Sequence, residues 1–356
     1  MRSIGLAYGN RTFNLLLKTR QVSADFMSIL VTGGAGYIGS HMVWRLVEAG
    51  EKVIVVDNLV TGFAWAVAPE AEFVNGDCGD ADLLSRLIDR YAVDTIIHFA
   101  ASVVVPDSVA DPLAYYLNNT ARARTVVEAA VKGKVRHFIF SSTAAVYGRP
   151  THNPVGEDAL LKPESPYGRS KMMVEMMLAD TAAAHDLNYV ALRYFNVAGA
   201  DPVGRVGQST RGATHLIQAA CQTVLGKRSE IVVFGTDYPT PDGTCVRDYI
   251  HVSDLVAAHA DALKYLRSGG GNFVGNCGYG HGFSVHEVLD TVKRVSGEDF
   301  KIVLGERRMG DPASIIASPA LIKERFGWQP RHDNLDDIVR SALAWEVSPS
   351  NCNHLE

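Results

Sequence analysis

The sequence has few cysteines, no long apolar run and no excess of basic residues, and each absence excludes a class of protein. Its five cysteines are scattered over 356 residues without a CxxC pair, so neither a disulfide framework nor a zinc site is predicted. No apolar run approaches the roughly 18 residues of a membrane-spanning helix. The formal net charge of −5 argues against nucleic acid as a partner, because nucleic-acid-binding domains are usually basic. We therefore expect a cytoplasmic globular protein without a metal, membrane or nucleic-acid partner.

Residues 28–193 alternate short apolar segments with helical ones. Strands are predicted at residues 29–31, 53–56, 72–74, 95–99, 137–140 and 190–193, and helices at residues 40–49, 83–90, 119–131 and 166–185. Continuous apolar strands separated by helices indicate a parallel sheet covered on both faces, the doubly wound (Rossmann) α/β fold. Beyond residue 196, glycine and proline become frequent and the alternation loosens. This change predicts a smaller α+β substrate subdomain at the C-terminal side.

These changes in texture divide the chain into four parts. Residues 27–196 form the predicted Rossmann domain, to which segments near 249–276 return; residues 197–248 and 277–348 form the substrate subdomain, and residues 349–356 a tail. Residues 1–26 carry four basic residues and a single acid, Asp25, a composition that fits an organellar transit peptide. Because Met27 directly precedes the first strand, the segment also fits a disordered or non-native extension outside the fold, the interpretation we favour.

Three glycines, Gly33, Gly36 and Gly39, lie between the first predicted strand and the first predicted helix. Glycines there permit a tight turn and close approach of a dinucleotide pyrophosphate, which the helix N-terminus attracts through its free N–H groups and its dipole. Asp57 closes the second strand, where a carboxylate accepts hydrogen bonds from an adenosine ribose and repels a 2′-phosphate. The pattern therefore predicts NAD rather than NADP. Asp77, after the third strand, either reaches the adenine or caps a turn.

Tyr167 and Lys171 lie four residues apart at the start of a predicted helix, after the start signals Ser165 and Pro166. Residues at this spacing share a helix face. An adjacent ammonium and a cationic nicotinamide ring both favour the phenolate form of tyrosine, and a phenolate can take the proton of a sugar hydroxyl while hydride passes to NAD. Of the thirteen tyrosines, only Tyr167 has a lysine four residues later. Residues 141–143 (Ser-Ser-Thr), one strand–helix unit earlier, offer a hydroxyl that can complete the site.

Several longer sequence motifs narrow the choice of protein family. They are TGGAGYIGSH (residues 32–41), FSSTAAVYG (140–148), SPYGRSK (165–171), LRYFNVAGA (192–200) and VFGTDYPTPDGTCVRDYIHVSDL (233–255). Through them the chain resembles the extended short-chain dehydrogenases/reductases and, within that group, the UDP-glucose (UDP-galactose) 4-epimerases, from Met27 to about Trp345. The resemblance implies reversible NAD-dependent inversion at C4 of a UDP-hexose through a transient 4-keto intermediate. It also implies a homodimer formed by helices that include residues 119–131 and 166–185.

The resemblance also implies a role for each matching residue. Tyr167 would be the catalytic base, Lys171 would hold the nicotinamide ribose, and Thr143 would bind the 4-oxygen of the sugar. From the residues alone, Arg247 and Arg308 can equally pair with neighbouring acids such as Asp248 and Asp311. The NAD site would be lined by Gly33, Gly36, Tyr37, Ile38, Gly39, Asp57, Asn58, Asp77, Cys78, Phe99, Ala100, Ala101, Asn118, Ser141, Tyr167, Lys171 and Tyr194. The UDP-sugar would contact Thr143, Asn196, Leu216, Val232, Phe234, Arg247, Arg308, Asp311 and Ile315.

Three positions bear on which reaction and which sugar are expected. Nucleotide-sugar 4,6-dehydratases carry an acid pair after the threonine, whereas Ala144 and Ala145 stand there in this chain, so dehydration is not expected. At the position that gates the sugar pocket, family members carry tyrosine or a smaller residue, whereas this chain has Ile315. UDP-xylose/UDP-arabinose and UDP-N-acetylglucosamine therefore stay open as substrates, as does net NAD-dependent oxidoreduction of a nucleotide sugar. A non-catalytic dinucleotide sensor is the other class, and the complete set of catalytic residues argues against it.

Overall fold

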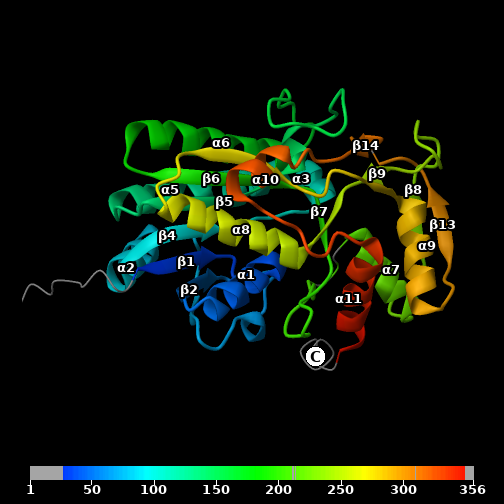
Figure 1. The fold of residues 1–356 in the computed structure, drawn as a ribbon, viewed down its shortest axis with the longest axis horizontal. Coiled ribbons are helices and arrows are strands. Elements are labelled where there is room, and N and C mark those ends of the chain that lie inside the picture. Colours follow the sequence, from blue (N-terminus) through cyan, green and yellow to red (C-terminus); the bar gives the residue numbers. More distant parts are fainter. Residues whose placement is uncertain (1–26, 211, 213, 309, 349–356) are drawn as a thin grey trace, which may run out of the picture.

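The computed structural model describes residues 27–210, 212, 214–308 and 310–348, so the predicted extension (1–26) and tail (349–356) lie outside the described residues. At its centre is a seven-stranded parallel sheet in the order β11-β6-β5-β4-β1-β2-β3 (Figure 1). This sheet confirms the predicted fold class. Its strands are β1 (Ser28–Thr32), β2 (Lys52–Asp57), β3 (Glu72–Asn75), β4 (Val93–His98), β5 (His137–Thr143), β6 (Asn188–Tyr194) and β11 (Phe273–Cys277).

Successive residues of the central strands pack into two separate apolar clusters, one on each face of the sheet. In β1, Ile29 and Val31 belong to one cluster and Leu30 to the other. Helices α1 (Tyr37–Glu48) and α8 (Val252–Arg267) pack into the first cluster, and helices α2 (Ala81–Tyr91), α5 (Arg122–Lys132) and α6 (Pro166–Ala184) into the second. Because both faces are covered, β1 is buried throughout. This burial explains why the sequence shows continuous apolar runs rather than strict alternation.

The helix predicted at residues 119–131 differs from the one observed. It begins as a π-helical segment, η2 (Tyr116–Ala121), and becomes the α-helix α5 only at Arg122. The wider π turn lets two consecutive asparagines reach the same residue: Asn118 donates to Ser102 Oγ over 2.8 Å, and Asn119 bonds the backbone N–H and C=O of Ser102 over 2.8 and 2.9 Å. Single π turns of this kind are common near functional sites. Short helical elements flank η2 and the sheet: η1 (Ala64–Ala66), α3 (Val105–Ala110), α4 (Pro112–Tyr115) and η3 (Ala144–Val146).

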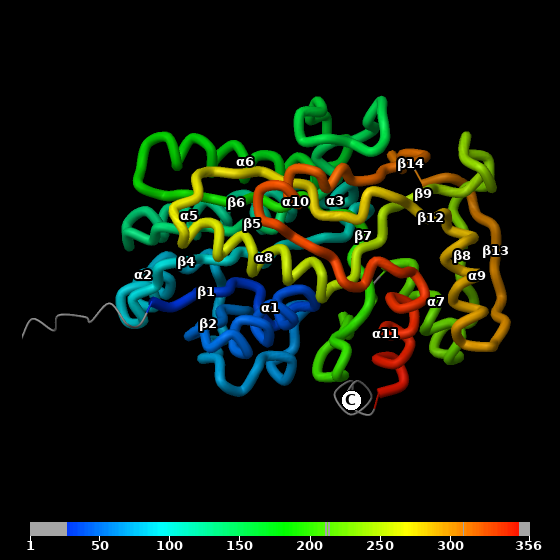
Figure 2. The backbone as a smooth tube through the Cα atoms, in the orientation of Figure 1, coloured from blue at the N-terminus to red at the C-terminus, as the bar shows by residue number. Residues whose placement is uncertain are grey.

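Most of the remaining elements gather to one side of the sheet, where Figures 1 and 2 show α7, α9, α11, β8 and β13 together, whereas α10 packs against α8 and β11. Their strands pair in small sheets: β7 (Asn196–Ala198) with β10 (Tyr249–His251), β9 (Val246–Arg247) with β12 (Phe283–Ser284) and β14 (Ser314–Ile315), and β8 (Ile231–Phe234) with β13 (Ile302–Gly305). The helices are α7 (Leu216–Val224), α9 (Val285–Ser296), α10 (Ala320–Phe326) and α11 (Leu335–Val347). Strand β11 returns to the edge of the main sheet beside β6. The residue numbers given above for the domain boundaries stay a prediction.

Aromatic and charged side chains connect the sheet to the C-terminal elements. The Trp65 ring, from the loop after β2, stacks on Trp345 of α11 at a centroid distance of 6.0 Å. Arg205 pairs with Glu48 of α1, and its guanidinium lies 4.7 Å from the ring centroid of Trp44. We refer to Trp65, Trp345, Arg205 and Glu48 as the clasp. Within the described part of the chain, no helix has both the length and the apolar character needed to cross a membrane.

Candidate active site

The glycine turn after β1 fits closely between the ends of the neighbouring strands. Gly33 has φ +73°, and a Cβ there would lie 2.5 Å from the backbone nitrogen of Ala100. A Cβ at Gly39 would lie 2.1 Å from the carbonyl oxygen of Gly33, so both positions require glycine. Helix α1 starts at Tyr37 behind Gly36, and no side chain caps it. Its first N–H groups and its positive dipole end therefore face the turn, which is the arrangement that binds a pyrophosphate.

Asp57 ends β2 next to this turn. One carboxylate oxygen accepts the N–H of Ala35 over 3.0 Å, and the other accepts the N–H of Leu59 over 2.8 Å. Asp57 therefore holds the glycine turn against the loop that follows β2. Each oxygen keeps a second lone pair, so the ribose contact stays a prediction that the geometry allows. Asn58 beside it is exposed, and its side-chain oxygen accepts the N–H of Val60.

A chain of polar contacts links Asp77 to the π-helical segment. Asp77 accepts the N–H of Gly79 over 2.7 Å and pairs with Arg122 over 2.8 Å. Arg122 also donates to the side-chain oxygen of Asn118 over 2.9 Å. These are the contacts expected if Asp77 caps a turn, and its contact with adenine stays a prediction. The sequence did not single out Arg122, although its place four residues after Asn118 is a helical spacing.

The three predicted catalytic residues are brought together at the carboxyl end of β5. Ser165 caps α6 by accepting the N–H of Gly168, and a Cβ at Gly168 would lie 2.6 Å from the oxygen of Ala145. Helix α6 thus packs directly against the residues that follow Thr143. The Thr143 hydroxyl lies near enough to Tyr167 to favour the phenolate of that residue, and the Lys171 amine donates to the carbonyl of Ser141 over 2.7 Å. All three catalytic side chains are buried.

Burial dominates the electrostatics of this site. It raises the pKa of Tyr167, and the hydrogen bond from Thr143 offsets only part of that effect. Burial also lowers the pKa of Lys171 to about 7, against the opposing influence of the Glu175 carboxylate. The sequence argument expected Lys171 to favour the phenolate of Tyr167, but in the protein alone desolvation is the larger effect. Ionisation of Tyr167 would therefore be favoured by a further positive charge in the site.

The other predicted NAD residues surround the glycine turn and the ends of β3, β4, β5 and β6. Phe99 packs against His259 with ring centroids 5.0 Å apart, and Ala100 and Ala101 follow it beside Gly33. Tyr194 and Ser141 hydrogen-bond through their hydroxyls. Tyr37 donates to the carbonyl of Gly199 over 2.6 Å, and Ile38 is partly buried beside it on α1. Cys78 is buried, and burial raises the pKa of its thiol to about 11.

Five of the predicted substrate residues lie on strands of the small sheets: Asn196, Val232, Phe234, Arg247 and Ile315. Arg247 of β9 pairs in register with Ile315 of β14, and its guanidinium lies 3.7 Å from Asp311. The Arg308 guanidinium lies 3.9 Å from the ring centroid of Phe234, which shares β8 with Val232. Among the described residues, no arginine pairs with Asp248, which instead accepts the N–H groups of residues 279, 280 and 317.

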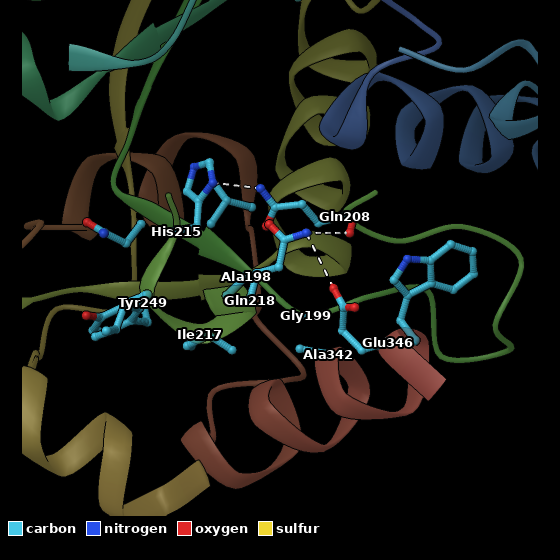
Figure 3. Close-up of a pocket in the computed structure, with 13 residues that line it drawn as sticks. Ala198, Gly199, Gln208, His215, Ile217, Gln218, Tyr249, Ala342 and Glu346 are labelled. Atoms are coloured by element: carbon cyan, nitrogen blue, oxygen red, sulfur yellow. Dashed lines mark hydrogen bonds between the residues drawn. The ribbon is translucent and has the colours of Figure 1, made fainter. Parts of the chain in front are cut away.

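Asn196 and Leu216 line a small buried cavity between β7, α7 and α11 (Figure 3). Its volume of about 20 Å³ is room for about one water molecule, not for a nucleotide. Gln218 donates to the carbonyl of Gln208 over 2.9 Å and approaches Glu346 at 3.4 Å. The cavity therefore holds a polar contact beside two predicted substrate residues, and none of the three predicted catalytic residues lines it.

Sequence reasoning missed a buried ion pair next to the catalytic residues. Glu175 and Arg193 lie 2.6 Å apart, each with 6% of its side chain exposed. Arg193 stands immediately before Tyr194, and Glu175 stands four residues after Lys171 on α6. That helical spacing was the available signal. Nothing in the sequence showed that a strand arginine would meet Glu175, because the contact is tertiary.

Known proteins are similar to this chain in both sequence and fold. The NAD dependent epimerase/dehydratase family matches residues 29–278. The UDP-glucose 4-epimerase of Azospirillum brasilense is 54% identical over 320 residues, which are 90% of this chain and 92% of that protein. The crystal structure of UDP-glucose 4-epimerase from Brucella ovis in complex with NAD has a TM-score of 0.87 at 43% identity, covering 89% of this chain and 97% of that chain. That of the Bifidobacterium longum enzyme in complex with NAD+ and UDP has a TM-score of 0.87 at 35% identity, covering 91% and 99%. The chain belongs to the NAD dependent epimerase/dehydratase family, which confirms the prediction from the motifs.

Proposed function

We infer that the protein is an NAD-dependent enzyme that inverts C4 of a UDP-hexose and so interconverts UDP-glucose and UDP-galactose. The single observation that carries this inference is the burial of Thr143, Tyr167 and Lys171 together at the carboxyl end of the sheet, beside the Gly33 turn. The relatives named above support the same reaction and confirm the predicted function, enzyme class and cofactor. Inversion at C4 leaves the substrate neither oxidised nor reduced.

The residues around the glycine turn fit NAD. A Cβ at Gly33 or Gly39 would collide with backbone, so the turn is shaped for close approach of a pyrophosphate to α1. Asp57 lies where an adenosine ribose would meet a carboxylate, and Ser141, Tyr167, Lys171 and Tyr194 lie where the nicotinamide end would reach the catalytic residues. When bound, NAD would accept the hydride from C4 of the sugar and return it to the same sugar carbon.

Tyr167, Thr143 and Lys171 perform the proton chemistry in this proposal. Thr143 lies beside Tyr167 and holds the 4-oxygen of the sugar within reach of the phenol. Tyr167 takes the proton of the 4-hydroxyl and, once the sugar has turned its other face, returns that proton to the 4-oxygen. Lys171 fixes the nicotinamide ribose and favours the phenolate. Ala144 and Ala145 follow Thr143, so no acid is placed there to eliminate water.

The substrate residues hold the UDP portion more firmly than the sugar. Arg247 and Arg308 supply guanidinium groups for the diphosphate, and Phe234 and Val232 supply an apolar edge for the uracil. Asn196, Leu216 and Asp311 complete this set. Ile315 is buried beside Ala144 and Phe195, so the wall it offers to the sugar is apolar. An apolar wall leaves the sugar free to rotate about its bond to the diphosphate, as inversion requires, and it leaves UDP-xylose/UDP-arabinose and UDP-N-acetylglucosamine as further candidate substrates.

The proposal includes a cytoplasmic homodimer. A groove of about 450 Å³ runs between α5 and α6, the helices expected at the contact. Apolar side chains are exposed nearby, with Met176 of α6 at 59% and Leu117 of η2 at 58%, and burial of such a patch favours association. Sedimentation of the purified protein distinguishes dimer from monomer.

Replacement of Tyr167 by phenylalanine tests the function. The Tyr167→Phe protein and the unchanged protein are incubated with UDP-galactose, UDP-N-acetylgalactosamine and UDP-arabinose, and the products are separated by chromatography. We expect conversion of UDP-galactose by the unchanged protein and a loss of about a hundredfold or more in kcat for Tyr167→Phe, because the general base is removed. Tyr91→Phe, on α2 at the amino end of the sheet, is the matched control and should keep full activity. Conversion of none of the three sugars, or an unchanged rate in Tyr167→Phe, would contradict the proposal.

A further inference from the structure

The buried ion pair of Glu175 and Arg193 lies one helical turn beyond the catalytic lysine. The Arg193 Nη2 and Nε atoms both donate to the Glu175 carboxylate, over 2.6 Å and 3.0 Å. The Ser142 hydroxyl donates to the same carboxylate. Arg193 comes from β6 and Ser142 from β5, so one side chain of α6 contacts two adjacent strands of the sheet. These contacts fix the position of α6 along the sheet as well as its distance from it.

The contacts occur where the catalytic side chains leave the sheet. Ser142 directly precedes Thr143, and Arg193 directly precedes Tyr194. On the same helix, Lys171 donates to the carbonyl of Ser141. A displacement of Glu175 along the strands would therefore carry Lys171 and Tyr167 away from Thr143.

Arg193 has partners beyond Glu175. Its Nη1 donates to the hydroxyl of Tyr147 over 2.9 Å, and its guanidinium lies 5.0 Å from the centroid of that ring. The Tyr147 hydroxyl donates in turn to the side-chain oxygen of Asn276 over 2.7 Å. Because the desolvation of a buried ion pair can exceed its attraction, such a pair is weak evidence of added stability. A role in placing charge near the catalytic residues accounts for it better.

Lys171 is surrounded by groups that do not balance its charge, apart from Glu175. Glu175 acts on it from α6 and His98 from β4, and the ring of Phe140 on β5 has its centroid 4.9 Å from the Lys171 amine. Burial lowers the pKa of His98 to about 3 and raises the pKa of Tyr194, so both are neutral near pH 7. Among the described residues, Glu175 is the anion that raises the pKa of Lys171 against the effect of burial. The carboxylate therefore favours the ammonium form.

We propose that Glu175 is a positioning residue of the reaction, which fixes Lys171 and Tyr167 against β5 and keeps the amine of Lys171 protonated for its work beside Tyr167. The inference rests on the proposed function, because it assigns Glu175 to the same catalytic set. Glu175 is not one of the residues proposed to contact the substrate or NAD. It acts through Lys171, Ser142 and Arg193.

Glu175→Gln tests the proposal, because it keeps the shape of the side chain and removes its charge. Without that charge the pKa of Lys171 falls further. We expect kcat for UDP-galactose at pH 8 to fall about tenfold or more, with KM changed less than about twofold, since the residues holding UDP are untouched. The alkaline side of the kcat profile should move to lower pH by about one unit, the size of effect expected from one nearby charge. Glu175→Asp, which keeps the charge, should have the same pH dependence of kcat on the alkaline side as the unchanged protein.

Asp94→Asn is the matched control. Asp94 forms a comparable pair with Arg267, with contacts of 3.1 and 3.0 Å, but at the amino end of β4, away from Lys171. It should lower the melting temperature and leave the shape of the pH profile unchanged. The double variant Glu175→Gln/Arg193→Gln leaves no unpaired charge in the interior, and it replaces Glu175→Gln if that variant fails to fold.

A direct titration separates failure of this inference from failure of the proposed function. Protein labelled with ¹³C at the ε-carbon of lysine is titrated by NMR, and Lys171→Met identifies the resonance. We expect Lys171 to titrate at lower pH in Glu175→Gln than in the unchanged protein, whether or not UDP-galactose is converted. An unchanged titration together with an unchanged alkaline limb overturns the inference. Absence of epimerisation in the unchanged protein overturns the proposed function and leaves the NMR test valid.

Discussion

The surroundings of single residues determine which side chain fits and how it ionises. Gly39 must lack a side chain because the carbonyl of Gly33 occupies the place of its Cβ. Tyr167, the proposed base, lies in a site that by itself opposes its ionisation, since burial raises its pKa. The glycine positions and the tyrosine–lysine pair could be predicted because their spacing is local. Glu175, Arg193, Arg122 and Ser102 could not, because their partners come from distant segments that only the folded sheet brings together.

Lys171 should make the free energy of unfolding depend on pH. The pKa of Lys171 is lowered from 10.5 to about 7 by burial, so the folded protein binds fewer protons than the unfolded chain between these values. The stability of the NAD-free protein should therefore rise with pH over this range. Below pH 7 the buried ammonium carries its full cost, on the order of a few kcal/mol.

Lys171→Met isolates this contribution. The NAD-free variant should be more stable than the unchanged NAD-free protein below pH 7, and the difference in the free energy of unfolding should shrink as the pH rises toward 10. Urea unfolding at several pH values measures it. A difference that is constant across this range would contradict the account, because it would show that the protonation state of Lys171 does not change on folding.

At the scale of elements, the main sheet was more predictable than the substrate side. The strands β1, β2, β4, β5 and β6 are buried on both faces and therefore show as continuous apolar runs. Strands β9, β12 and β14 contain two residues each, too few to produce a periodic pattern. The helix predicted at 119–131 was wrong at its start, because the widened turn of η2 is set by contacts with Ser102 and not by helix propensity.

Asn119→Ala tests the account of η2. Asn119 is buried and bonds the N–H and C=O of Ser102 and, over 3.1 Å, the hydroxyl of Ser170. Its loss leaves buried backbone groups without partners, which costs about 2–3 kcal/mol. Urea unfolding measures the loss, and Asn188→Ala at the start of β6 is the control, with an expected cost below about 1 kcal/mol. Equal stability of the two variants would show that the Asn119 contacts do not hold η2.

At the scale of the molecule, the C-terminal elements must keep a fixed position relative to the main sheet so that a cofactor bound to one and a sugar bound to the other can react. The clasp connects them, because Trp65 lies in the segment between Asp57 and β3 and its ring stacks on Trp345 of α11. The same loop is tied to the glycine turn, since the N–H of Phe63 donates to the carbonyl of Ala35 over 2.9 Å. Retention of NAD should therefore depend on a contact remote from the nicotinamide.

Trp65→Ala is expected to release NAD more readily, because the loop beyond Asp57 loses its contact with α11. The amount of NAD released by denaturing a known amount of gel-filtered protein reports the NAD that stays bound, and it should fall in this variant. Phe300→Ala, a partly buried aromatic residue before β13, is the control and should retain NAD. Full retention of NAD by Trp65→Ala would show that the clasp does not hold the cofactor loop.

The central claim is that one carbon of a UDP-hexose is inverted and recovers its own hydrogen. It is tested most directly by incubating the protein with UDP-glucose that carries deuterium at C4, in ordinary water and without added NAD, and analysing the product by mass spectrometry and NMR. The account predicts UDP-galactose that keeps the deuterium at C4, because the hydrogen removed by the buried site returns to the same carbon without reaching solvent. Product with solvent hydrogen at C4, or a dehydrated or oxidised sugar in place of UDP-galactose, would contradict it.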